Sequence, residues 1–158
     1  MNKIAAALVL AVSVVSLAAC GSSSTSGAPT AVVTSPADAC TVLIDGGYAK
    51  SATDFGKQAS EILANASSLS RDMNRMSILM DQFASKVADP AVKAAATKDA
   101  SNMATMTTAL ESLSNSSDAS TMTASMNKFT SIPLSETLID HTVLDYCPAV
   151  QTAMASTN

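Results

Sequence analysis

Aromatic and charged residues are scarce in this chain of 158 residues. Tryptophan is absent, only five residues are tyrosine or phenylalanine, and only 14% are charged, with 13 acidic against 9 basic side chains. Proteins that bind nucleic acid present clustered basic residues, often with aromatic rings between them, and anionic lipid likewise attracts basic clusters. The composition therefore argues against binding to nucleic acid, and against binding to anionic lipid through charge alone.

The groups on which most catalysis and metal binding depend are also few. His141 is the single histidine, so the chain has no H-E-x-x-H motif and no second imidazole ligand. No G-x-S-x-G motif occurs, and Gly46-Gly47 lacks the lysine and serine of a phosphate-binding loop. His141 and Asp145 would share one face of a helix, but they make an incomplete metal site. The sequence predicts no catalytic residue, no metal and no cofactor.

The first twenty residues form the most specific pattern in the chain. A short basic segment, residues 1–3, precedes an almost wholly apolar stretch over residues 4–15. About a dozen apolar residues suit a secretory signal and are too few to span a bilayer comfortably. Leu17-Ala18-Ala19-Cys20, followed by Gly21, resembles the lipobox of bacterial lipoproteins in every position.

That resemblance covers residues 1–20 and implies a processing route. In the lipoprotein family the cysteine thiol receives a diacylglyceryl group, a dedicated peptidase cuts before the cysteine, and the new first residue carries acyl chains such as palmitate. It implies loss of residues 1–19 and lipidation of Cys20. Several acyl chains would then hold the mature chain on the extracytoplasmic face of a cell membrane, or on an outer membrane if the host has one.

Two cysteines remain once Cys20 is assigned to the lipid. Cys40 and Cys147 lie near the two ends of the expected domain, and an exported protein meets an oxidising compartment. We expect a disulfide between them, worth about 4–5 kcal/mol from the entropy of the loop it closes. The alternatives are two free thiols or a metal pair, and a metal pair would need further histidine or cysteine ligands.

A change in composition divides the mature chain. Residues 20–34 are rich in serine, threonine, glycine, alanine and proline, and we expect them to form a lipidated tether. Residues 35–150 carry helical patterns and suit one domain. Residues 151–158 are expected to form a flexible C-terminal tail.

A run of apolar residues spaced alternately by four and three predicts one long amphipathic helix. Ser51-Ala52-Thr53-Asp54 offers a capping signal before this helix, and Asp89-Pro90 is expected to end it and to begin the next. The run consists of Phe55, Ala59, Ile62, Ala66, Leu69, Met73, Met76, Met80, Phe83 and Val87.

Further helix signals flank this run. Ser35-Pro36-Ala37-Asp38 predicts a first helix, which Asp45-Gly46-Gly47 ends. The apolar alternation resumes after Pro90, and later helices are expected from Asp118 and from about Ser135. No segment alternates with period two. The chain therefore predicts an all-α bundle of four to five helices, with a long antiparallel helical hairpin and one disulfide.

Methionine is abundant at the predicted core positions. Core packing is the first interpretation, because methionine fills irregular gaps between helices. Thioethers also select Cu(I), and a methionine-rich interior can adapt to an apolar ligand, so the same residues are candidate ligand-binding residues. They are Met73, Met76, Met80, Met103, Met106, Met122 and Met126.

Asp99 interrupts the apolar alternation of the second long helix. An unpaired carboxylate is costly to bury. We therefore expect a local drift in register that turns Ala100 inward in place of Asp99.

Three hypotheses of function follow. The first is a non-enzymatic envelope lipoprotein whose helical domain binds a protein partner or a cell-wall component. The second is a carrier or sensor of an apolar small molecule or lipid held within the bundle. The third is a prophage-type lipoprotein that blocks superinfection, which a small, tethered helical domain would suit. The sequence is also compatible with a dimer, because heptad-like apolar runs can pack between chains.

Overall fold

A computed structural model describes residues 35–132 and 138–156 of the chain. The lipobox and the expected tether lie outside these residues. The described ranges form helices and contain no strand, so the all-α prediction is confirmed.

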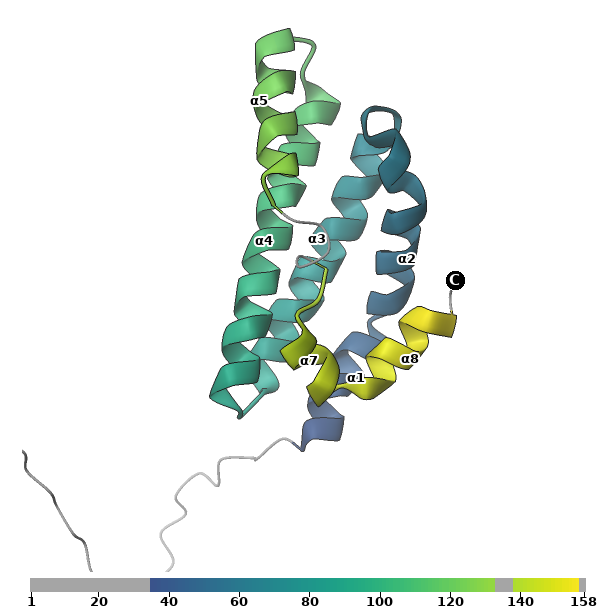
Figure 1. Ribbon diagram of the computed structural model, residues 1–158, viewed down its shortest axis with the longest axis vertical. Coiled ribbons are helices and arrows are strands. Elements are labelled where there is room, and N and C mark those ends of the chain that lie inside the picture. The colour runs from purple at the N-terminus through teal and green to yellow at the C-terminus, as the bar shows by residue number, and fades with distance from the viewer. Residues whose placement is uncertain (1–34, 133–137, 157–158) are drawn as a thin grey trace, which may run out of the picture. The chain divides into compact units, whose positions relative to one another are not determined.

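The centre of the bundle is the predicted antiparallel hairpin of α3 (Ile62–Lys86) and α4 (Pro90–Asn115), shown in Figure 1. Asp89 caps α4, since its carboxylate accepts the backbone N–H groups of Ala91 and Val92 at 2.8 and 3.2 Å. Pro90 occupies the first turn, where its missing N–H costs nothing. The Asp89-Pro90 signal therefore begins the helix that the sequence predicted.

A two-glycine corner joins α1 (Pro36–Asp45) to α2 (Tyr48–Gln58). A Cβ atom on Gly46 would lie 2.2 Å from a Leu79 methyl carbon, and Gly47 has a φ of 75°, so both positions favour glycine. The Arg75 guanidinium of α3 donates to the Gly46 carbonyl from Nη2 and Nε, at 2.7 and 3.2 Å. These two bonds hold the corner against the central hairpin.

The expected single helix through Phe55 and Val87 is wrong, because the chain reverses between α2 and α3. A 3-10 turn, η1 (Ala59–Glu61), separates the two helices, and α2 packs against α3. The Gln58 amide donates to the Asp54 carbonyl at 3.1 Å, and the Asn65 amide donates to the Gln58 carbonyl at 3.4 Å. The second bond satisfies the Gln58 carbonyl, one of those that the end of α2 leaves unpaired. The apolar spacing continued across the turn because both sides face one core.

The expected helix start at Ser51-Ala52-Thr53-Asp54 is also wrong. These residues lie inside α2, which already begins at Tyr48 after the left-handed Gly47. Ser51 and Ala52 are buried, and Asp54 forms an ion pair with Lys50 one turn earlier. Because this part of α2 packs against α3, the helix begins before these residues, although such residues often cap helices.

The later helices complete the bundle. α5 (Ala119–Thr130) is capped by the Asp118 carboxylate and packs on α4. The predicted helix start at about Ser135 lies outside the described ranges, which leave out residues 133–137. Leu138 and Ile139 are not helical, and the short α7 (His141–Tyr146) begins after Asp140, which caps it. The chain then continues in α8 (Pro148–Ser156), so residues 151–156 are helical where we expected a tail. Buried Val150 and the adjoining Cys147 anchor that helix.

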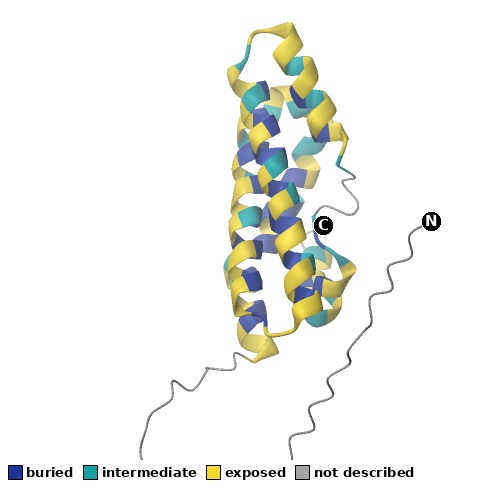
Figure 2. Ribbon diagram, turned by 90° about the vertical axis from the view of Figure 1, so that its left-hand side faces the viewer, coloured by how far each residue is buried: buried dark blue, intermediate teal, exposed yellow. Residues whose placement is uncertain are grey.

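The disulfide between Cys40 and Cys147 is present, with the two Cα atoms 5.7 Å apart. It ties α1 to the junction of α7 and α8, which gather at one end of the bundle in Figure 1. The buried faces of the helices turn inward to a single core, whereas α5 is largely exposed (Figure 2). An edge-on contact between Phe83 and Tyr146, with ring centres 6.1 Å apart, joins the hairpin to α7.

Candidate functional site

The methionines divide into an interior group and a half-buried pair. Met73, Met76, Met80, Met103 and Met106 have no exposed surface and are packed into the core. Met122 and Met126 on α5 are only partly buried against it. Core packing is thus what the structure shows for the first five, and the ligand-binding interpretation of all seven stays a prediction.

His141 and Asp145 lie on α7, and both are exposed. Among the described residues, no three histidine, cysteine or acidic side chains come together as a possible metal site. Cys20, the predicted lipidation site, lies outside the described ranges.

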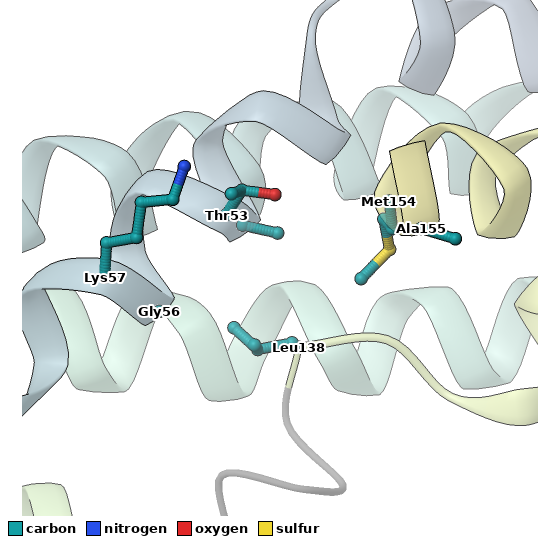
Figure 3. Close-up of a pocket in the computed structure, with 7 residues that line it drawn as sticks. Thr53, Gly56, Lys57, Leu138, Met154 and Ala155 are labelled. Carbon is teal, nitrogen blue, oxygen red and sulfur yellow. The ribbon is translucent and has the colours of Figure 1, made fainter. Parts of the chain in front are cut away.

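A groove that the sequence did not predict lies between α2 and α8 (Figure 3). Its volume is about 490 Å³, which is within the usual range of about 300–1,000 Å³ for small-molecule sites. One wall comes from α2, the opposite wall from α8, and Leu138 projects from the segment before α7. The lining residues are Ala52, Thr53, Gly56, Lys57, Leu138, Met154 and Ala155.

The groove is apolar at one side and polar at the other. Leu138 and Met154 are the largest apolar side chains of the lining, while Thr53 and Lys57 bring a hydroxyl and an ammonium group from α2 (Figure 3). No carboxylate in the described part of the chain forms an ion pair with Lys57, whereas Lys50 is paired with Asp54. Since Gly56 has no side chain and a Cβ atom there would meet open space, the α2 wall is low at this point.

A buried polar cluster lies next to this groove, on the same helix and the same connecting segment. Tyr48 stands one turn before Ala52 on α2 and has no exposed surface. Asp99 on α4 is 1% exposed, and its Oδ2 accepts the backbone N–H of Asp140 at 2.7 Å. The expectation that Asp99 turns away from the core is therefore wrong: both Asp99 and Ala100 are buried, and α7 packs against α4.

Two polar atoms of this cluster have no hydrogen-bond partner. They are the Tyr48 hydroxyl and Asp99 Oδ1, the buried side-chain oxygens left unpaired within the described ranges. Almost all buried polar groups in proteins find a partner, so an unpaired pair calls for a physical explanation.

The electrostatics of the cluster follow from burial. Burial raises the pKa of Asp99 to about 6; the Asp140 carboxylate adds to the increase, while the Asp140 N–H and the Lys98 ammonium oppose it. Burial also raises the pKa of Tyr48 well above its usual value, and the charge of Asp99 adds to this. In contrast, hydrogen bonds from Thr142 hold the pKa of Asp140 below its usual range. Asp99 is therefore the group of the cluster that titrates near neutral pH.

Comparison of the chain with protein-family models, curated proteins and solved structures found no match. Across residues 35–132 and 138–156, no helix is both long enough and apolar enough to cross a membrane.

Proposed function

We propose that this chain is a membrane-anchored lipoprotein of the bacterial cell envelope, with a non-enzymatic helical domain that binds a protein partner or a cell-wall component. The acyl chains on Cys20 would hold it to the membrane, and residues 20–34 would separate the domain from the bilayer. A cell membrane facing the extracytoplasmic side is the proposed location, or an outer membrane where the host has one.

The observation that carries this proposal is the use of the three cysteines. Cys40 and Cys147 are joined in the fold, which leaves Cys20 as the odd cysteine of the chain. That residue stands at the end of Leu17-Ala18-Ala19-Cys20, after a basic segment and an apolar stretch. A structural disulfide suits an exported protein and therefore supports the compartment that we propose from the N-terminal pattern.

The test of the anchor is fractionation of cells that express the full chain or its Cys20→Ala variant. We expect the wild-type protein in the membrane fraction, with a mass that begins at Cys20 and includes diacylglyceryl and acyl groups. Cys20→Ala removes the acceptor thiol and should abolish the added lipid mass, whereas the matched control Ser24→Ala should leave it intact. Wild-type protein without lipid would contradict the proposal.

The alternative is a carrier or sensor of an apolar molecule, which the groove beside Leu138 and Met154 favours. Native mass spectrometry of the protein extracted from envelopes separates the two functions. A bound mass of lipid size supports the carrier, and a bound protein or glycan supports the interaction domain. An empty protein at every extraction condition would count against both.

A further inference from the structure

The segment that precedes α7 links the buried cluster to the groove. Leu138 forms part of the groove lining, Ile139 is buried in the core, and the Asp140 N–H is bound by Asp99 at 2.7 Å. These three consecutive residues therefore fix one groove wall to a buried carboxylate on α4. A change at Asp99 reaches Leu138 through two residues of backbone.

We propose that Asp99 is a proton-controlled latch, which holds residues 138–140 in place when it is protonated and releases the Leu138 wall of the groove when it ionises. The latch depends only on contacts within the helical domain. Its physiological meaning rests on the proposed export, since an envelope protein meets the pH outside the cytoplasm.

The unpaired oxygens explain how a proton would act. A proton on Asp99 removes a buried negative charge and gives the carboxyl group a donor hydrogen. Oδ1 has no partner, and the Tyr48 hydroxyl, which feels the Asp99 charge, has none either. The protonated acid can thus be buried at lower cost than the carboxylate, while Oδ2 still accepts the Asp140 N–H.

The titratable groups around Asp99 contribute to the direction of the effect. They are the neutral Tyr48 from α2, Asp140 at the cap of α7 with its neighbour His141, and Lys98 from α4 itself. Burial and Asp140 disfavour the charged form more than Lys98 and the Asp140 N–H favour it. A folded pKa of about 6, against 3.8 in water, means that the closed latch binds the proton more tightly than a hydrated, open one. By linkage, the equilibrium constant for opening then rises by up to about a hundredfold as the pH increases from 4 to 8.

The test is a pH titration by nuclear magnetic resonance of the full chain in neutral detergent, labelled at the aspartate carboxyl carbons, the amide nitrogens and the methionine methyl groups. Three signals report on the latch: the Asp99 carboxyl, the Asp140 amide and the Met154 methyl in the groove. The methyl groups of Met76 and Met80 serve as internal controls, because they lie in the closed core.

We expect the three reporter signals to shift with one shared midpoint near pH 6, while the two core methyl groups stay constant. Hydrogen exchange at the Asp140 amide, corrected for its intrinsic pH dependence, should accelerate above that midpoint. The Asp99→Asn variant should abolish the shared transition, whereas Asp81→Asn, at an exposed site on α3, should preserve it.

The wild-type titration alone can overturn the proposal. An Asp99 carboxyl that does not titrate between pH 4 and 8 would exclude the switch. An Asp99 that titrates while the Asp140 amide and the Met154 methyl remain constant would exclude the link to the groove. Survival of the transition in Asp99→Asn would assign it to another group.

Discussion

The two ends of this bundle are held together by different means. At one end, which we call the closed end, α1, α7 and α8 meet. Three contacts there join segments far apart in the sequence: the disulfide, the Phe83–Tyr146 ring contact and the Asp99–Asp140 hydrogen bond. At the opposite end, α5 packs on α4 and buries little besides Phe129 and Ser125 (Figure 1). Leu63, near the η1 turn, is 61% exposed.

This contrast shows where a small, alanine-rich bundle obtains its stability. Short side chains give each helix pair limited apolar area, so the closed end depends on a covalent bond and on bonds to the backbone. At the opposite end, no disulfide or hydrogen bond joins the described residues of α5 to α4, and α5 is held by the packing of Phe129 and of two half-buried methionines. We therefore expect the closed end, which includes the groove and Asp99, to be the more rigid one, and α5 to unfold locally first.

The largest effect is expected from removing the disulfide. Replacing both cysteines in Cys40→Ala/Cys147→Ala should lower the free energy of unfolding by about 4–5 kcal/mol, because the unfolded chain regains the entropy of a long loop. Urea denaturation followed by circular dichroism measures the change. A loss below about 1 kcal/mol would mean that packing alone holds the closed end.

A matched pair of methionine substitutions compares the two ends directly. Met80→Ala removes a fully buried side chain and should cost about 2–5 kcal/mol of unfolding free energy through lost burial and a cavity. Met122→Ala removes a half-buried side chain on α5 and should cost under about 1 kcal/mol. Equal costs in the same urea experiment would contradict the difference between the ends.

The stability of the fold should also change with pH through Asp99. The pKa of Asp99 is raised from 3.8 to about 6 in the fold, so its favourable contribution is present below pH 3.8 and is lost as the pH rises through 6. The free energy of unfolding of Asp99→Asn, relative to wild type, should therefore increase by up to about 3 kcal/mol between pH 4 and pH 8.

Because the pKa of Asp140 is lowered, its own contribution to the free energy of unfolding changes at more acidic pH and does not account for a change between pH 4 and pH 8. Denaturation of the two proteins at matched pH values measures the difference. A constant difference across the window would show that Asp99 has an ordinary pKa in the fold.

Local signals in the sequence were sufficient for much of the fold. The helix starts at Ser35 and Asp89 follow from capping side chains and a proline that act within one turn, and both are present. The Cys40–Cys147 bond followed from counting cysteines once Cys20 was set aside.

The errors arose where distant segments decide the outcome. Apolar spacing could not reveal the turn at η1, because a chain that reverses around one core keeps the same spacing on both sides. Asp99 was expected to turn outward because nothing nearby in sequence could satisfy it; its partner is a backbone N–H 41 residues further along the chain. The groove needs α2, α8 and Leu138 together, and the sequence predicted residues 151–156 of α8 as part of a tail.

Native-state hydrogen exchange along the whole chain tests the contrast between the two ends most directly. The account predicts that amides of α3 near Met80 exchange only through global unfolding, whereas those of α5 exchange through a local opening of much lower free energy. If the α5 amides proved as protected as those around Met80, the bundle would unfold as one unit and the contrast would be wrong.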